Sequence, residues 1–420
     1  MSTADAPSTS SADSRANRLF AGAALVLLAF NLRPVVNAVG PLVPQMRDDT
    51  GISLTLTGLL VALPLVAFSL LGVFAPMLVR GIGVRATVLV ALNVLTVGQL
   101  IRVGPQLWLL FLGSAIALAG VAIGNVVTPA VVRQYFPDRI GALTATYTTT
   151  LTLGGAASAG LSVPVAQAMG SWRAGLGVWA IAAALALLAW LLLGRRGVPA
   201  VPAQRGVPSA AGTVSPGRIA RTRIGTTLAV YFGVQAMIAY IVFGWLPEIL
   251  TDRGMTPARA AVLNATIIVV GLVPAALSSV LLNRPRRPEY VVVALAACYG
   301  IAFAGLAVGA RDVHPGTPGV WVAFACAVLI GIGTAAFPIA LALIALHTRT
   351  AQATTALSAF VQCGGYLMAA AGPFLFGTLH ELTGSWTLPL VVITLLAIVQ
   401  ARFAFAAVRG GHLEDELAMP

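Results

Sequence analysis

Twelve runs of mainly apolar residues constrain this chain more than any other feature of its sequence. A helix needs about 20 such residues to cross the hydrocarbon core of a bilayer. Only 9% of the 420 residues are charged and 58% are hydrophobic, which leaves too few charges to cover a soluble surface. The runs cover residues 19–39, 54–79, 86–101, 107–132, 141–168, 174–194, 224–250, 260–282, 290–309, 319–346, 353–379 and 388–405, and residues 86–101 are short. We therefore predict an all-α polytopic membrane protein with twelve transmembrane helices.

The longest stretch between two apolar runs separates the first six predicted helices from the last six. Residues 195–223 contain Pro, Gly, Ser and six arginines, a composition typical of a flexible or surface-lying linker. We therefore predict two six-helix bundles, at residues 19–194 and 224–408. Residues 1–18 are rich in Ser, Thr, Ala and Asp and lack the basic start of a signal peptide, which predicts a disordered tail. Residues 409–420 form a second tail.

Three short patterns recur in the same order in both halves. PQMRDDTGIS (44–53) resembles PEILTDRGMT (247–256), G-x4-P at 124–129 recurs at 333–338, and GSW at 170–172 recurs at 384–386. The offsets grow slowly, from 203 to 209 to 214 residues. Internal symmetry of this kind is how many secondary transporters are built, with the binding site between the halves near the bilayer midplane. The two bundles are therefore predicted to be pseudo-symmetric.

The arginines predict the orientation in the membrane. All 25 basic residues are Arg; 18 fall in the tails and the loops on their side, and six fall in the opposite loops. Because cytoplasmic loops carry the excess of positive charge, both termini are predicted to be cytoplasmic. The net charge of +12 is scattered through these loops rather than gathered on one face, so we expect a lipid bilayer and no nucleic acid as partner. We expect the inner (plasma) membrane of a bacterium, and a monomer.

Arg33 is the only charge in the first apolar run. A guanidinium at the centre of a membrane helix costs roughly 2.5–3.5 kcal/mol, so it usually faces a protein interior or a watery cavity. Pro34 loosens the helix behind it, and Asn37 lies one turn on along the same face. All thirteen acids lie in loops, tails or helix ends, so Arg33 has no evident intramembrane partner, and an anionic ligand would compensate its charge. The alternatives are a tie to backbone carbonyls or a loop acid such as Asp48 that folds back.

A few polar and aromatic side chains in the other runs complete the predicted substrate site. Gln362 and Tyr366 share a helix face because they are four residues apart. The alternatives are an interhelical hydrogen bond for Asn125, helix packing by small hydroxyl residues for Tyr147 and the threonines after it, and an interface anchor for Trp245. The predicted substrate-binding residues are Arg33, Asn37, Asn125, Tyr147, Gln235, Tyr240, Trp245, Gln362 and Tyr366.

Charged groups near the span ends are candidates for coupling or gating. Glu248 is the acid closest to the interior of a span, at the outer end of the seventh. The cytoplasmic arginines could hold the two bundles together in one state, or could only set the topology. The predicted coupling or gating residues are Glu248, His347, Arg80, Arg85, Arg133 and Arg139.

Catalysis has little support in the sequence. The four histidines are far apart and lack the spacing of metal ligands, and the three cysteines, all within apolar runs, lack it too. No phosphate-binding loop of the G-x4-GK[ST] kind is present, and no Ser or Thr has a neighbouring base in a pattern that suggests a nucleophile. We therefore predict no catalytic residue, no metal and no cofactor. Transport energy would come from a gradient, with protons as one coupling ion, or transport is facilitated diffusion.

Several stretches resemble the cyanate and 2-nitroimidazole transporter family, a branch of the major facilitator superfamily: LRPVVNAVGP, GNVVTPAVVRQYFPDRIGALTATYT, WLPEIL and LSAFVQCGGYLMAAAGPFLFGTLHELTGSW. The resemblance implies two domains that rock about a central cavity and carry small, often anionic or nitro-bearing compounds. By position it makes Arg33 the cavity cation, surrounded by Asn37, Asn125, Tyr147, Gln235, Gln362 and Tyr366. The loop APMLVRGIGVR lacks the acid of the superfamily signature, and His347 stands where a second basic residue is expected.

The leading hypothesis is a secondary transporter that moves a small, anionic compound by alternating access around Arg33. The alternative is an efflux pump for neutral or weakly charged drug-like compounds such as nitroimidazoles, with Arg33 in a structural role. A membrane enzyme would need a catalytic cluster. A sensor would normally carry a soluble signalling domain, and no loop is long enough to form one.

Overall fold

The chain folds into helices throughout the part described by the computed structural model, residues 11–71, 74–195, 215–277, 280, 282 and 287–418. The first half contains α1 (Ser11–Asn31), α2 (Pro34–Asn37), α3 (Val39–Thr50), α4 (Leu54–Leu71), α5 (Ala75–Ile101), α6 (Leu107–Tyr135), the 3-10 turn η1 (Pro137–Arg139), α7 (Ile140–Ala168) and α8 (Trp172–Arg195). The second half contains α9 (Pro216–Ile219), α10 (Arg223–Asp252), α11 (Pro257–Ala276), α13 (Pro288–Val308), α14 (Pro318–Gly333), α15 (Ala336–Leu346), α16 (Ala351–Thr383), α17 (Thr387–Val408) and α18 (Leu413–Ala418).

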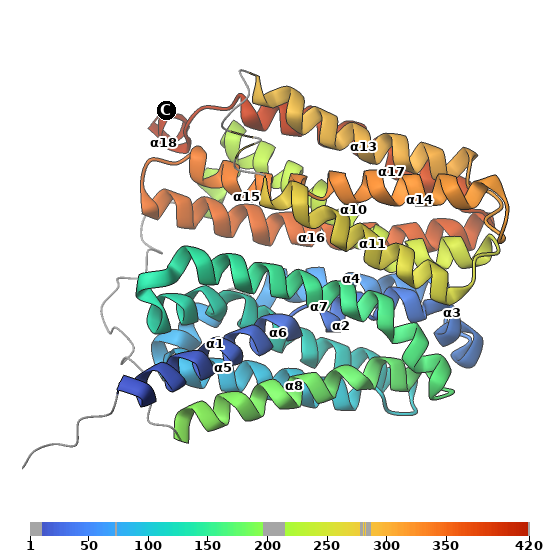
Figure 1. Cartoon of the computed structure of the whole chain (residues 1–420). Helices are drawn as coiled ribbons and strands as arrows, with labels where there is room; N and C mark the ends of the chain where they lie inside the picture. Colours follow the sequence, from blue (N-terminus) through green and yellow to red (C-terminus); the bar gives the residue numbers. More distant parts are fainter. Residues whose placement is uncertain are drawn as a thin grey trace, which may run out of the picture.

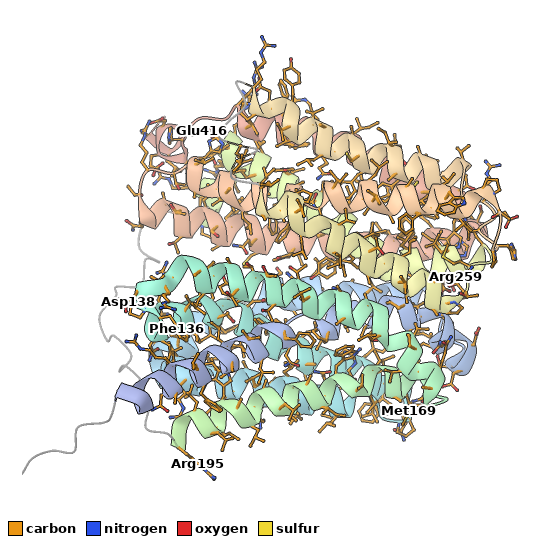
Figure 2. The ribbon with its side chains drawn as sticks, viewed as in Figure 1. Phe136, Asp138, Met169, Arg195, Arg259 and Glu416 are labelled. Atoms are coloured by element: carbon orange, nitrogen blue, oxygen red, sulfur yellow. The ribbon has the colours of Figure 1, made fainter. Side chains whose placement is uncertain are left out.

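The two halves form two layers of nearly parallel helices (Figure 1). The blue-to-green layer holds α1 to α8, and the yellow-to-red layer holds α10 to α17. Helix α1 begins, and α18 lies, at the left of the view; we call this the termini end and the right side the opposite end. Figure 2 shows Asp138, Arg195 and Glu416 at the termini end, with Met169 and Arg259 at the opposite end.

All twelve predicted spans correspond to helices. Eleven described segments are long and apolar enough to cross a membrane. The twelfth, predicted at residues 141–168, is α7, which has 29 residues and six threonines and packs against α1, α8 and α11. At 1.5 Å per residue it is about 43 Å long, more than the hydrocarbon thickness. The all-helical, twelve-span prediction therefore holds, although the hydroxyl groups of α7 make it less apolar than the rest.

Several boundaries differ from those predicted. Helix α1 already begins at Ser11, so residues 11–18 are helical rather than part of a disordered tail. The short third run belongs to the 27-residue helix α5, which reaches back to Ala75 across a kink at Gly83. The predicted linker contains the one-turn helix α9, and the second tail contains α18. Residues 1–10 and 196–214 of the predicted tail and linker lie outside the described residues.

The internal repeat is visible as the same hydrogen bond in each half. Trp172 Nε1 donates to Asp49 Oδ2 at 2.8 Å, and Trp386 Nε1 donates to Asp252 Oδ2 at the same distance. The two aspartates are 203 residues apart and the two tryptophans 214, the offsets predicted for their repeats. Each bond ties the end of one helix to the start of another at the opposite end. The hydrogen bond from Trp172, and then that from Arg173, lowers the pKa of Asp49 below its usual range.

The two bundles touch through α3 and α4 on one side and α10 and α16 on the other, and through α7 and α11. Glycines allow the closest approaches. A Cβ on Gly40 would overlap the backbone carbonyl of Phe243, and a Cβ on Gly58 would lie 2.6 Å from the carbonyl oxygen of Pro373. Backbone therefore lies directly against backbone between the bundles in the half near the opposite end.

Replacing Gly40 by Ala tests this packing. The new methyl group would meet a backbone carbonyl that cannot rotate away, so we expect the variant to lose about 1–3 kcal/mol of stability, the usual cost of overpacking. Gly364→Ala on α16 is the matched control, because nothing lies within 4 Å of its Cβ position. The control should be neutral or more stable, since Ala favours a helix over Gly by about 1 kcal/mol. Thermal melting of both variants in detergent measures the difference; equal effects would contradict the contact.

Candidate functional site

Arg33 lies at a break in the first membrane helix. Helix α1 ends at Asn31, and Pro34 occupies the first turn of α2, where a missing N–H is tolerated. The N–H groups of Val36 and Asn37 both donate to the Arg33 carbonyl at 3.0 Å. The proline thus interrupts the helix where the sequence predicts, and the half-buried Arg33 side chain leaves from the interruption.

Helix α7 leaves room for Arg33 and Asn37 by placing a glycine against them. A Cβ on Gly155 would lie 2.6 Å from Asn37 Nδ2 and 3.4 Å from Arg33 Cβ. The neighbouring Gly154 packs in the same way against the carbonyl of Phe30. Arg33 and Asn37 therefore share one side of the broken helix, as their spacing predicts, and Asn37 is only 4% exposed.

Two tyrosines of the second bundle complete the surroundings of Arg33. The guanidinium lies within hydrogen-bonding range of the Tyr240 hydroxyl group on α10, and it also acts electrostatically on Tyr366 on α16. The Tyr366 ring packs edge-on against Phe68 and Phe232, with centroids 5.6 and 5.0 Å away. Charge from one bundle and hydroxyl groups from the other thus meet at one place between the halves.

No carboxylate pairs with Arg33 among the residues that the structure describes; the ion pairs there involve other arginines and histidines. Asp48, the loop acid that could fold back, is exposed on α3, about four helical turns further along the chain. In the same described ranges, no three His, Cys, Asp or Glu side chains are grouped closely enough to hold a metal ion. Arg33 is therefore a partly buried cation with hydroxyl and amide neighbours.

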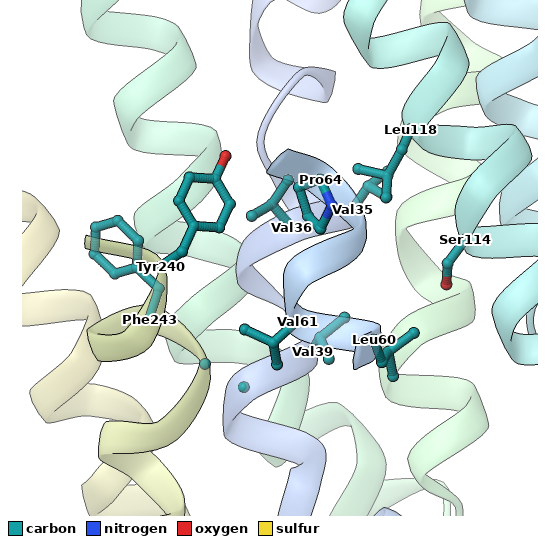
Figure 3. Close-up of a pocket in the computed structure, with 12 residues that line it drawn as sticks. Val35, Val36, Val39, Leu60, Val61, Pro64, Ser114, Leu118, Tyr240 and Phe243 are labelled. Atoms are coloured by element: carbon teal, nitrogen blue, oxygen red, sulfur yellow. The ribbon is translucent and has the colours of Figure 1, made fainter. Parts of the chain in front are cut away.

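A small pocket lies next to the polar cluster formed by Arg33, Asn37, Tyr240 and Tyr366, and Tyr240 lines it (Figure 3). It is apolar, and Tyr240 and Phe243 of α10 form one wall and Leu118 and Ser114 of α6 the other, with valines of α2 to α4 between them. It has room for the centre of about one water molecule. This pocket is too small for a polyatomic substrate unless the bundles move.

Other predicted site residues lie toward the termini end from Arg33. Asn125 is half-buried and follows Gly124, whose Cα lies against the Leu32 side chain. Tyr147 is half-buried on α7, two turns before Gly155. Gln362 Nε2 donates to Ser358 Oγ at 2.7 Å, one turn before Tyr366.

Two predicted site residues are not brought to Arg33. Gln235 is 1% exposed inside the second bundle, where it accepts a hydrogen bond from Gln400 and donates to the Tyr299 hydroxyl group at 3.1 Å. Trp245 is fully buried, and its Nε1 donates to the Pro373 carbonyl at 3.0 Å. Both make packing contacts inside the protein, and Trp245 is too deeply buried to be the interface anchor that was its alternative.

Glu248 forms an ion pair across the two bundles with Arg47. Its side chain is 1% exposed, and its Oε2 atom has no hydrogen-bond partner. Nearby, Glu381 of α16 accepts hydrogen bonds from the Thr55 hydroxyl group at 2.6 Å and the Thr55 N–H at 2.8 Å. These contacts hold the bundles together at the opposite end. The sequence pointed to Glu248 but not to its partner, although Arg47 lies within the first repeat.

The remaining gating candidates lie near the termini end. Arg80, Arg133 and Arg139 are exposed and form no ion pair within the described ranges, while the Arg85 guanidinium lies over the end of α8 at Gly194. His347 ends α15, and its Nδ1 lies 3.0 Å from the Gly411 carbonyl oxygen. Burial lowers the pKa of His347, so this side chain favours the neutral form.

One residue that the sequence assigned to a loop is fully buried. Arg102 caps the C-terminus of α5 and is 1% exposed. Its Nη1 donates to the Val35 carbonyl at 3.2 Å, directly behind the break that carries Arg33. Its position at the edge of an apolar run gave no signal of this burial.

Two helical bundles with a polar cluster between them, closed at one end, define a multi-pass membrane transporter. The family model of the Major Facilitator Superfamily matches residues 19–373. The chain therefore belongs to this superfamily, and its relatives are transporters rather than enzymes.

Three transporters are similar over nearly their whole length. The chain is 32% identical to the uncharacterized transporter YycB of Bacillus subtilis, with 93% of each covered. It is 30% identical to the 2-nitroimidazole transporter of Escherichia coli, with 94% of this chain and 96% of the relative covered. It is 28% identical to the E. coli cyanate transport protein CynX, with 90% and 96% covered. The predicted family is therefore confirmed.

A solved structure supports the fold. The nucleoside transporter NupG, as its D323A mutant, superposes with a TM-score of 0.78 at 13% identity, covering 93% of this chain and all of NupG.

The Arg47–Glu248 pair is open to a direct test. Arg47→Gln leaves a buried carboxylate without its partner, and breaking a buried pair costs about 3–5 kcal/mol. We therefore expect lower thermal stability and greater accessibility of the contact between the bundles to a thiol reagent, measured at a cysteine placed at Val61, which is buried against Gly244 of α10. The double variant Arg47→Gln/Glu248→Gln should recover much of the loss, because neither charge remains. Equal losses in the single and the double variant would contradict an energetic coupling.

Proposed function

We propose that this transporter moves a small anionic compound, and that Arg33 is the cation that binds it. The observation that carries the proposal is the half-buried guanidinium at the helix break, which has no carboxylate partner among the described residues and lies beside the hydroxyl group of Tyr240. A guanidinium presents five N–H donors in a planar fork that fits a carboxylate or a similar anion. Asn37 adds an amide on the same side.

The relatives support a small substrate. One is named for cyanate, an anion of three atoms, and another for 2-nitroimidazole, whose nitro group presents two acceptor oxygens in a plane. A planar pair of acceptors is common to a nitro group and a carboxylate. Arg33 is suited to either because its donors are planar too.

We further propose that the substrate links the two bundles. Arg33 and Asn37 belong to the first bundle, and Tyr240 and Tyr366 belong to the second. An anion bound to the guanidinium would accept hydrogen bonds from the tyrosine hydroxyl groups, so binding would draw the bundles together around it. The contacts at Gly40, Gly58 and Glu248 close the opposite end, while residues 141–150 of α7 at the termini end are exposed or half-buried. With cytoplasmic termini, as the arginines predict, this is an inward-facing state of an alternating-access cycle.

A neutral substrate is the second candidate, and one observation favours it. The rings of Phe68, Phe232 and Tyr366 pack together beside the polar cluster, a surface that suits a flat heteroaromatic compound. In that case Arg33 would have only a structural role at the helix break.

Arg33→Lys distinguishes these possibilities. A point ammonium cannot replace the planar fork, so we expect uptake of an anionic substrate by proteoliposomes to fall by at least about tenfold, the equivalent of one charge-assisted hydrogen bond. The substrate is found first by thermal stabilisation of purified wild type against cyanate, small carboxylates, nitroaromatic compounds and their neutral analogues, since a ligand of the folded state raises the melting temperature.

Arg402→Lys is the matched control, because Arg402 is an exposed arginine within membrane helix α17. It should keep wild-type transport. Wild-type rates in Arg33→Lys would refute the anion site. Stabilisation by neutral aromatic compounds that survives Arg33→Ala would support the second candidate.

A further inference from the structure

A second arginine, Arg102, lies in the first bundle with its charge uncompensated. Its side chain is 1% exposed and is among the largest fully buried side chains of the protein. A Cβ on Gly113 of α6 would overlap the Arg102 backbone, so α6 packs directly on the residue that caps α5. The guanidinium is therefore held in the interior rather than in a loop.

Most donors of this guanidinium are unused. Nη1 donates to the Val35 carbonyl at 3.2 Å, while Nε and Nη2 are buried and have no partner. Within the described ranges no carboxylate forms an ion pair with Arg102. A backbone carbonyl satisfies one N–H but brings no countercharge, and burial of an unpaired charge is strongly unfavourable.

Two further polar side chains in this part of the bundle are also unsatisfied. Gln99 precedes Arg102 by one turn on α5, so the two side chains share a face of the helix. It is fully buried, and neither its Nε2 nor its Oε1 has a partner. Ser114, next to the glycine that packs on Arg102, is 3% exposed, and its hydroxyl group has no partner. Three side chains thus present buried N–H and O–H donors with nothing to receive them.

The available space limits the size of a guest. The pocket described above shares two walls with this region: Val35, whose carbonyl binds Arg102, and Ser114. The unpartnered atoms of Arg102 and Gln99 have almost no accessible surface, and this adjoining pocket has room for the centre of only about one water molecule. A carboxylate or a phosphate is too large, whereas a monatomic anion needs only modest movement. A water molecule would satisfy donors but would leave the charge of Arg102 uncompensated.

We propose that Arg102, Ser114 and Gln99 form a binding site for one monatomic anion, with chloride as the physiological ion of that class. The anion accepts from the free guanidinium nitrogens, the Ser114 hydroxyl group and the Gln99 amide, and it supplies the missing countercharge. The site stabilises the first bundle behind the helix break. It is separate from the substrate cation Arg33 and does not depend on the proposed substrate.

The test is the halide dependence of thermal stability. Purified protein in detergent is melted in sodium gluconate, with sodium chloride or sodium bromide substituted at constant ionic strength. We expect the melting temperature of the wild type to rise with halide and to saturate, because an ion that binds the folded state stabilises it. The Arg102→Gln variant should show no halide response, and in gluconate it should melt at or above the wild-type temperature because the uncompensated charge is gone.

Further variants keep the test decisive if Arg102→Gln fails to fold. Ser114→Ala retains the charge and removes one donor, so the halide response should require several-fold more halide. Arg311→Gln, at an exposed arginine, should respond as the wild type does. No specific halide effect in the wild type, as expected if only water fills the site, would overturn the proposal, and so would an unchanged response in Arg102→Gln or Ser114→Ala. A response lost in Arg33→Gln but kept in Arg102→Gln would place the anion at the substrate cation and would also overturn it.

Discussion

The interruption of the first membrane helix at Arg33 and Pro34 is the constraint on which the arrangement around it depends. Backbone groups freed at a break must find partners, because the surrounding lipid offers none. Residues on two sides of the break contact its backbone. Arg102 reaches the Val35 carbonyl from within the first bundle, while Gly154 and Gly155 bring α7 against it from the side that faces α11. The same interruption directs Arg33 toward the tyrosines of the second bundle.

Paired and unpaired charges are distributed unevenly between the helix ends and the region of the break. Acids pair with arginines near both ends of the helices, as in Arg47–Glu248 and Arg173–Asp49 at the opposite end and Arg349–Asp415 at the termini end. Among the described residues, neither Arg33 nor Arg102 has such a pair. The acids therefore fasten the helix ends, and the region around the break is left with excess positive charge. An anion, whether transported or resident, is the simplest species that can balance it.

The sequence predicted the features that depend on long apolar runs or on repeats. The spans were found because a run of about 20 residues identifies a membrane helix whatever it packs against. The Trp–Asp hydrogen bonds coincide with repeats that were visible as PQMRDDTGIS and GSW. Contacts that depend on helix rotation were not predictable: Gln235 and Tyr240 lie five residues apart on one helix, yet one faces Tyr299 and the other faces Arg33. The burial of Arg102 was not predictable either. A charged residue at the edge of an apolar run has the same sequence pattern whether its side chain points into the bundle or into water.

The glycine contact between Gly40 and Phe243 has a mechanical consequence. Position 243 lies 203 residues after position 40, which is the offset of the first repeat, so the contact joins equivalent points of the two halves. Two backbones this close resist sliding past each other but can still roll. Across a hydrocarbon core of about 30 Å, a roll of about 10° displaces the far end by about 5 Å. The Gly40–Phe243 contact would thus act as a pivot near one face of the membrane. A small rotation about it would open the other face wide enough for a solute of a few atoms.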